Sequence, residues 1–531
     1  MDSVYQLALG IFGDPWVVAI VGLLTFAGLL IFLKRGSSKS VSICSSGDIV
    51  RPLGICESMF FNCGQHGAML LINILFLRSA RQLKEGDIAE ALKRLRELHP
   101  LLNVTVKRDQ GRFIFVKLGA ETAIPICVDS RTNWKEVYED QSHARFEENG
   151  LLWKVLFLPN ARLDQIQTDS SSYQSSVIFL FNHSIIDGTS YMRLFNTFLD
   201  VLCDVVEERP TCVDPFPLLP CMEDMADAQI SYTIPQRLGS LIMYCLFSIP
   251  PLFSFLMNRL LLSKNVYFDK FSKEVDILSD VKPKNCAVPL ILSKEKTKTL
   301  LSQCKENKTT VQGAVQAASM IAAARLWKDD SATEKIKVRT EITLNIRGSF
   351  EEEVPAEALG LFIGRLEGSD QVSSNIPNSQ EFWELARQIS TSLHARLKQK
   401  EYLEEMKVFD IMRKVSPTGD MMVDLLIKQS MTPSRGRSPA LLTYSNLGNC
   451  SFLNRSKESP VEIIGRFGMS TQHIAGAIFY NNLATINGQL FWNVVYASHI
   501  VPERLAQEFV DNILDILNMA LNIAGPETSR A

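Results

Sequence analysis

The sequence lacks most of the short motifs that indicate a bound cofactor or metal. No Cys-x-x-Cys pair occurs among the eleven cysteines. The glycine-rich patterns of nucleotide binding, the His-Glu-x-x-His pattern of zinc proteases and the Gly-x-Ser-x-Gly pattern of serine hydrolases are also absent. We therefore expect neither a metal site nor a bound cofactor.

An excess of charge of one sign is missing as well. The chain of 531 residues carries 55 basic and 58 acidic side chains, a net charge of −3, whereas nucleic-acid binders usually show a basic surplus. A hydrophobic content of 46% with 21% charged residues is typical of a folded chain. The cysteines are odd in number and scattered, which favours buried, reduced thiols in the cytosol over a disulfide framework.

One stretch lacks ionisable residues altogether. Residues Pro15–Leu33 read PWVVAIVGLLTFAGLLIFL, and nineteen residues at ~1.5 Å each reach about the ~30 Å of a bilayer core. This predicts one uncleaved transmembrane helix. A cleaved signal peptide or a buried core helix are the alternatives, but no basic residue precedes the run. Because Lys34, Arg35 and Lys39 follow it, we expect a single-pass protein of the endoplasmic reticulum with its body in the cytosol.

Predicted strands and helices alternate through the remainder, which indicates an α/β fold with two similar-sized domains. The connection between them contains the apolar segment Leu238–Leu262, interrupted by Pro250 and Pro251. Consecutive prolines disfavour a second spanning helix, so we expect a bent hairpin on the membrane surface, with a buried connection as the alternative. The predicted organisation is tail 1–14, anchor 15–33, linker 34–59, first half 60–225, connection 226–285 and second half 286–525.

The most informative segment reads VIFLFNHSIIDGTS and places His183 at the end of a predicted buried strand. A helix follows, for which Thr189 or Ser190 is the expected cap. An imidazole with a pKa near its usual ~6.5 can accept a proton at pH 7. Asp187 either orients this imidazole or fixes the turn through an arginine, and Gly188 is expected to give the turn its backbone freedom. A core histidine beside a capping aspartate is the alternative.

The His-x-x-x-Asp-Gly arrangement resembles the acyl-CoA-dependent acyltransferase superfamily with the chloramphenicol-acetyltransferase-like fold. This superfamily includes alcohol acetyltransferases, wax ester synthases, plant BAHD enzymes and the condensation domains of peptide synthetases. The likeness extends over roughly residues 60–525. Its further matches, in chain order, are DIAEALKRLRELHPLL at Asp87–Leu102, the segment Leu292–Leu326, TLNIRG at Thr343–Gly348 and YSNLG at Tyr444–Gly448.

The resemblance implies a channel between the two domains with His183 at its centre as general base, and acyl-CoA as co-substrate rather than a bound cofactor. It also implies that Asp187 pairs with Arg347 in a structural role. Weaker candidates for supporting the site or lining the channel are Asn345, Ser445 and Asn446.

The sequence departs from its relatives in two places. Asn182 stands where many relatives have a first histidine, and the plant DFGWG signature is absent, with Gly465–Gly468 reading GRFG instead. The contacts to CoA therefore stay unassigned. We expect His473 and His499 to be structural.

These features predict a membrane-anchored enzyme that transfers an acyl group from acyl-CoA to a hydrophobic alcohol or lipid. A non-catalytic lipid-binding or scaffold protein of the same fold is one alternative. N-acylation of an amine, which uses the same mechanism, is the other.

Overall fold

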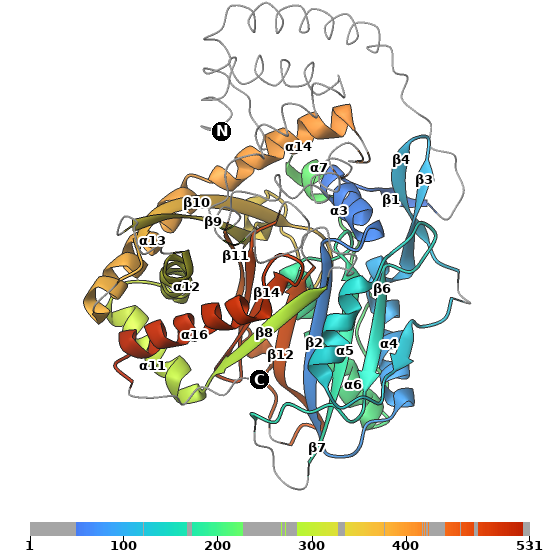
Figure 1. Cartoon of the computed structure of the whole chain (residues 1–531). Coiled ribbons are helices and arrows are strands. Elements are labelled where there is room, and N and C mark those ends of the chain that lie inside the picture. Colours follow the sequence, from blue (N-terminus) through green and yellow to red (C-terminus); the bar gives the residue numbers. More distant parts are fainter. Residues whose placement is uncertain are drawn as a thin grey trace, which may run out of the picture.

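The chain forms two α/β halves that lie side by side (Figure 1). The computed structural model describes residues 49–119, 122–166, 172–226, 267, 271, 284–327, 335–375, 378–416, 418, 420, 423, 441–456, 458–471 and 476–523. The predicted anchor Pro15–Leu33 and the apolar segment Leu238–Leu262 lie outside this range. Within it, no helix combines the length and the apolar character needed to cross a bilayer.

The first half is organised around two long antiparallel strands, β2 and β7, whose side chains are almost all buried. Each contains a long, mainly apolar stretch, as expected for central strands covered on both faces. Its elements are β1 (Ile49–Pro52), α3 (Ile55–Gln65), β2 (Leu70–Ser79), α4 (Glu85–Leu98), β3 (Val104–Asp109), β4 (Arg112–Lys117), β5 (Ile126–Val128), α5 (Trp134–Asp140), β6 (Trp153–Leu158), β7 (Tyr173–Asn182), α6 (Gly188–Val206) and α7 (Met222–Ala226).

The second half has a six-stranded sheet in the order β10-β9-β11-β13-β14-β8. Helix α12 packs against both α13 and α16 over this sheet. The elements are β8 (Asn285–Leu292), α11 (Lys294–Glu306), α12 (Val311–Trp327), β9 (Lys335–Asn345), the short 3₁₀ helix η3 (Arg347–Ser349), β10 (Ile363–Ser373), α13 (Ser379–Lys398), η4 (Glu401–Leu403), α14 (Glu404–Val415), β11 (Leu442–Asn449), β12 (Val461–Ser470), β13 (Phe479–Ile486), β14 (Gln489–Ala497) and α16 (Glu503–Ala520).

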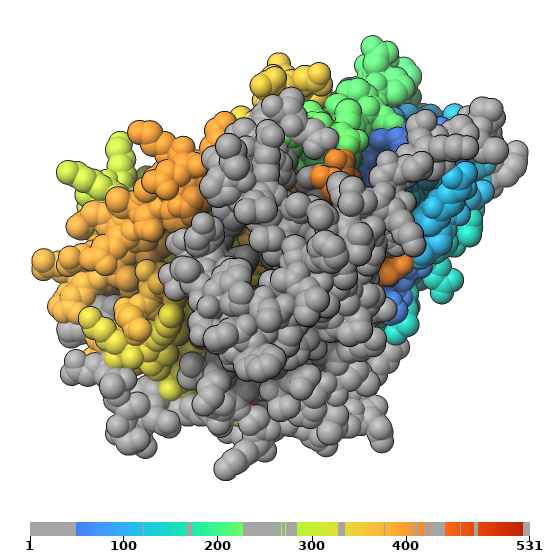
Figure 2. All heavy atoms as spheres, turned by 90° about the horizontal axis from the view of Figure 1, so that it is seen from above, coloured from blue at the N-terminus to red at the C-terminus, as the bar shows by residue number. Residues whose placement is uncertain are grey.

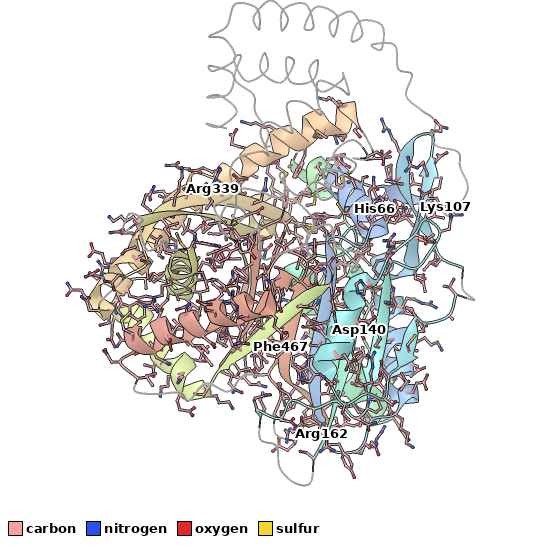
Figure 3. The ribbon with its side chains drawn as sticks, in the orientation of Figure 1. His66, Lys107, Asp140, Arg162, Arg339 and Phe467 are labelled. Carbon is pink, nitrogen blue, oxygen red and sulfur yellow. The ribbon has the colours of Figure 1, made fainter. Side chains whose placement is uncertain are left out.

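Strand β12 belongs to the second half of the sequence but to the sheet of the first half. That sheet has the order β12-β2-β7-β6-β5, and β12 pairs with β2 from Val461 opposite Ser79 to Ser470 opposite Leu71. Phe467 of β12 lies in the interior (Figure 3), where its ring stacks on Trp134. The exchanged strand ties the two halves together.

At one end of the molecule, α14 packs on both α3 and α7 and brings the two halves into contact (Figure 1). Seen from above, the green segment that contains α7 adjoins blue segments of the first half (Figure 2). Cys56 of α3 and Met222 of α7 belong to the same buried cluster as Phe362 and Met406 of the second half. Helix α3 is therefore part of the contact between the halves.

Most predicted elements are confirmed within one turn or a few residues. The helix stripe Ile88, Leu92, Leu95 and Leu98 is buried in α4, and the Asn487-Gly488 hairpin joins β13 to β14. The linker prediction 34–59 was too long, because β1 and the start of α3 fall within it.

Candidate active site

His183 follows β7 directly and lies in the turn that leads into α6. The residue is 8% exposed, and its ring stacks on Phe60 with 4.4 Å between centroids and 14° between planes. Nδ1 is buried and has no hydrogen-bond partner among the described residues. Burial lowers the pKa of His183, and the backbone groups of His183 and Ile186 and the charge of Asp187 offset only part of that effect. The imidazole is therefore neutral at pH 7.

The carboxylate of Asp187 is fully occupied by partners other than His183. Oδ1 accepts hydrogen bonds from the Ser190 amide at 2.8 Å and from Nη1 of Arg347 at 3.1 Å. Oδ2 accepts from the Phe362 amide at 2.8 Å and lies 2.9 Å from Nη1 of Arg347. The predicted pairing of Asp187 with Arg347 is thus confirmed, and the alternative that Asp187 orients the imidazole is wrong.

Arg347 reaches this position from η3 in the second half, and only 7% of its side chain is exposed. Its Nη2 donates to Oγ of Ser190 at 2.6 Å, and that hydroxyl donates in turn to the Gly360 carbonyl at 3.0 Å. The guanidinium also lies over the Phe362 ring, 4.8 Å from its centroid. Because breaking a buried ion pair leaves an uncompensated charge, this contact holds the halves in one arrangement beside His183.

Two local predictions about the turn were wrong. The cap of α6 is Asp187, whose carboxylate accepts from the third helical amide, and not Thr189 or Ser190. Gly188 is the first residue of the helix and does not have a positive φ. Instead, a Cβ atom at this position would lie 2.8 Å from Cδ2 of Leu447. The glycine is needed because the second half approaches closely, and not for backbone freedom.

Asn182, which stands where many relatives have a first histidine, has a structural role. Its side chain is completely buried. Oδ1 accepts from the Ser184 amide at 3.0 Å, and Nδ2 donates to the Phe61 carbonyl at 3.4 Å. The side chain therefore fixes the backbone on both sides of His183 and attaches it to α3.

The weaker candidates have contacts that are mainly structural. Oδ1 of Asn345 accepts from the amide and from Nη1 of Arg347, at 3.1 and 3.2 Å, so it orients that arginine. Asn446 donates to Oε1 of Gln312 at 3.1 Å, and Ser445 is half-buried in β11. His499 lies in the turn after β14, and His473 is outside the described residues.

The GRFG run, which the sequence has in place of the plant signature, also contacts the helix that begins at the motif. Arg466 is 2% exposed. It donates through Nε to Oδ1 of Asn73 at 3.1 Å and through Nη2 to the hydroxyl of Tyr191 at 2.7 Å. Since Tyr191 lies in the first turn of α6, the exchanged strand β12 contacts the helix that begins at the motif.

Three residues that contact His183 or the Asp187–Arg347 pair were not predicted from the sequence. They are Phe60, Phe362 and Ser190, the last as a hydrogen-bonding partner. Ser190 lies inside the motif segment, and its spacing from Asp187 is the one that a cap requires. Phe60 and Phe362 carry no recognisable signal, because their positions depend on contacts between distant segments.

The described residues contain no group of three or more histidine, cysteine, aspartate or glutamate side chains able to hold a metal ion. None of the nine cysteines in this part of the chain forms a disulfide.

Over most of its length, the sequence is similar to that of known proteins. The sequence model of the alcohol acetyltransferase family matches residues 137–520, well over half of the chain. The N-acetyltransferase SLI1 of Saccharomyces cerevisiae is 22% identical over 400 residues, which are 68% of this chain and 78% of that protein.

Two solved structures share the fold. TRI3 trichothecene 15-O-acetyltransferase of Fusarium sporotrichioides has a TM-score of 0.62 at 12% identity, covering 91% of this chain and 97% of that chain. Polyketide synthase associated protein 5 of Mycobacterium tuberculosis has a TM-score of 0.57 at 14% identity, covering 88% and 98%. The chain therefore belongs to the alcohol acetyltransferase family, within the superfamily of acyltransferases that carry the His-x-x-x-Asp-Gly motif on the chloramphenicol-acetyltransferase-like fold.

Proposed function

We propose that the protein transfers an acyl group from acyl-CoA to the hydroxyl of a hydrophobic alcohol or lipid, with His183 as general base. The observation that carries this proposal is a neutral, buried imidazole at the turn where the two halves are joined by Asp187 and Arg347. A rigid turn that holds one titratable group is the arrangement that general-base catalysis needs.

In this reaction the ring nitrogen of His183 accepts the proton of the acceptor hydroxyl while the oxygen attacks the thioester carbonyl. The resulting intermediate collapses by breaking the carbon–sulfur bond. The CoA thiolate then takes the proton back from the imidazolium, so the products are an ester and free CoA. The proposal requires no covalent acyl-enzyme and no resident cofactor, since acyl-CoA serves as co-substrate.

Asp187 has no proton-transfer role in this scheme. Its oxygens already accept hydrogen bonds from Ser190, Phe362 and Arg347. It keeps the turn in place, and Gly188 lets the second half approach it.

The acceptor is proposed to be an alcohol because the family is named for alcohol acetyltransfer, and because TRI3 is an O-acetyltransferase. N-acylation of an amine is the second candidate, favoured by the N-acetyltransferase SLI1. An amine would lose its proton to the same imidazole, so only the acceptor differs.

The site of action is proposed to be the cytosolic face of the endoplasmic reticulum membrane. The apolar run Pro15–Leu33 supports the membrane anchor, and the basic residues after it support a body in the cytosol. The choice of the endoplasmic reticulum is part of the proposal. An acceptor dissolved in the membrane would then reach the body directly.

The test is acyl transfer by detergent-solubilised protein incubated with labelled acetyl-CoA, a longer acyl-CoA and a lipid extract, with identification of the labelled product. Replacing His183 by alanine is expected to reduce transfer by ~10²–10⁴ with the melting temperature nearly unchanged. His66→Ala is the matched control, because His66 is an exposed histidine at the end of α3.

Labelled ester would support the alcohol proposal, and labelled amide would replace it by N-acylation. Full transfer by His183→Ala would contradict the assignment of the base. If wild-type protein binds lipid but releases no CoA from any donor, the non-catalytic alternative holds instead.

A further inference from the structure

Most catalytic histidines are oriented by a hydrogen bond to the ring nitrogen that does not react. In His183 no side chain among the described residues forms a hydrogen bond with Nδ1. The carboxylate of Asp187 is taken by Arg347, Ser190 and Phe362, and the polar groups that act on the ring directly are the backbone groups of His183 and Ile186. A side chain that helps to fix the plane of the imidazole must therefore act through a contact other than a hydrogen bond.

Phe60 is the side chain in a position to do so. Its ring is stacked on the imidazole at 4.4 Å, nearly parallel with it. Both nitrogens of an imidazole exchange protons in the plane of the ring, so a partner on the face restricts the ring's rotation and leaves the reactive edge free. The same contact removes water from one face of His183.

Helix α3, which carries Phe60, is itself fixed at its beginning. Glu57 forms two hydrogen bonds of 2.7 Å with Arg51 and accepts a third from the Gly54 amide at 2.8 Å. The carboxylate of Glu223, on α7, accepts from the Cys56 amide at 2.7 Å. Two buried carboxylates thus hold the first turn of the helix.

The other end of α3 is attached to the strand that delivers His183. A Cβ atom at Gly64 would lie 2.2 Å from Nδ2 of Asn182, so the helix and this side chain are in close contact. Nδ2 also donates to the carbonyl of Phe61, the residue after Phe60. The stacked ring and the imidazole are therefore held in one frame by Asn182.

We propose that Phe60 is a positioning residue of the acyl-transfer reaction, whose ring sets the plane of the His183 imidazole and shields one of its faces from water. The inference rests on the function proposed above. It assigns to an aromatic face the orienting role that a hydrogen-bonded carboxylate has in other enzymes.

The shielding has a measurable consequence, because burial is what lowers the pKa of His183. Two charged groups near the ring are paired with a cation: Asp187 with Arg347, and Glu57 with Arg51. The third carboxyl group, that of Glu223 on α7, has a pKa raised by burial and accepts a hydrogen bond from the Cys56 amide. Cys63 on α3 is a neutral thiol at physiological pH, since burial raises its pKa to about 12. Replacing Phe60 therefore changes the hydration of His183 without removing a charge.

The experiment compares Phe60→Leu, which removes the flat face, with Phe60→Tyr, which keeps it. Met59→Leu is the matched control on the same helix. For Phe60→Leu we expect kcat to fall by roughly tenfold, KM for acyl-CoA to stay within about threefold, and the acidic limb of the kcat/KM profile to move to higher pH. Phe60→Tyr should restore the position of that limb.

A second measurement needs no substrate and separates this inference from the proposed function. In protein labelled at histidine Cε1, the resonance missing from His183→Gln is assigned to His183 and followed against pH by NMR. Phe60→Leu should raise the midpoint, and Phe60→Tyr and Met59→Leu should not. An unchanged midpoint and wild-type kcat in folded Phe60→Leu would overturn the role of Phe60 while leaving His183 as the base. If the wild-type protein transfers no acyl group to any acceptor, the proposed function is wrong, and the positioning role of Phe60 in that reaction is wrong with it.

Discussion

His99 and His183 are two buried histidines with similar immediate surroundings, but only His183 is a candidate general base. Each ring is stacked on a phenylalanine: His99 on Phe216 with 4.6 Å between centroids, and His183 on Phe60 with 4.4 Å. Burial lowers the pKa of both, that of His99 to about 3. Burial and stacking therefore produce a neutral imidazole in both places.

The two sites differ in access and in what lies behind the ring. His99 has no exposed surface, and neither of its ring nitrogens has a hydrogen-bond partner in the part of the chain that the structure describes. It ends α4, where the Phe216 amide donates to the Leu98 carbonyl. His183 keeps 8% of its surface exposed and precedes a turn bound to the other half. The comparison indicates that a reachable edge and a rigid polar turn, rather than burial, distinguish a candidate base from a core residue.

The largest expected effect comes from removing the ion pair between Asp187 and Arg347, which lies beside His183. Arg347→Ala leaves the buried Asp187 carboxylate without its cation, which should lower the free energy of unfolding by about 3–5 kcal/mol. Transfer activity should fall too, because the turn beside His183 loses its link to the second half. Thermal unfolding and initial rates check both effects.

Arg365→Ala is the matched control, since Arg365 pairs with Glu341 at the surface with its side chain 45% exposed. An exposed pair of this kind contributes at most about 1 kcal/mol. Equal effects of the two substitutions would contradict the view that the Asp187 pair joins the halves.

The next effect concerns His99 and its response to acid. In the unfolded chain a histidine binds a proton near pH ~6.5, but in the folded protein His99 does so only near a pKa of about 3. Stability is therefore complete above pH ~6.5 and falls as the pH drops below it, by about 2 kcal/mol at pH 5. His99→Leu should remove this loss, so urea unfolding of the variant should depend less on pH between 7.5 and 5.

At pH 7.5 the same variant should keep acyl transfer near the wild-type rate, because His99 takes no part in the reaction. A loss of rate comparable to that of His183→Ala, in folded His99→Leu protein, would remove the distinction between the two histidines.

The parts of the site that were predictable are those that repeat a local pattern or a family motif. The strand and helix around His183 follow from an apolar run and a helical stripe, and the resemblance pointed to Arg347 as the partner of Asp187. The cap was misassigned because aspartate, threonine and serine are all good caps and lie here within four residues of one another, at Asp187, Thr189 and Ser190. Only the hydrogen bond from Ser190 identifies Asp187 as the cap.

The remaining features depend on contacts between segments far apart in the sequence. Strand β12 pairs with β2, from the opposite end of the chain, and no local periodicity specifies that partner. Phe60 lies on a helix that the prediction divided between linker and domain, and its neighbour His183 is a long way along the sequence. The spacing of residues within one segment cannot reveal such a pair.

The smallest expected effect tests what the glycine of the motif does, since His99 has no counterpart to it. Gly188→Ala places a methyl group 2.8 Å from Cδ2 of Leu447, the far end of a flexible side chain. Leu447 must therefore shift, and we expect a loss of about 1 kcal/mol in the free energy of unfolding with a reduced transfer rate. Chemical denaturation and steady-state kinetics measure the two.

The double variant decides between the two roles that a glycine can have here. If close packing is the reason for Gly188, then in the Leu447→Ala background the added methyl group has room, and Gly188→Ala should cost nothing there. Alanine could even stabilise the chain slightly, because it favours the first turn of α6 more than glycine does. If the turn instead required the backbone freedom of glycine, the loss would be the same in both backgrounds. A coupling of about 1 kcal/mol between the two substitutions would establish that the motif glycine is the point where the second half docks beside His183.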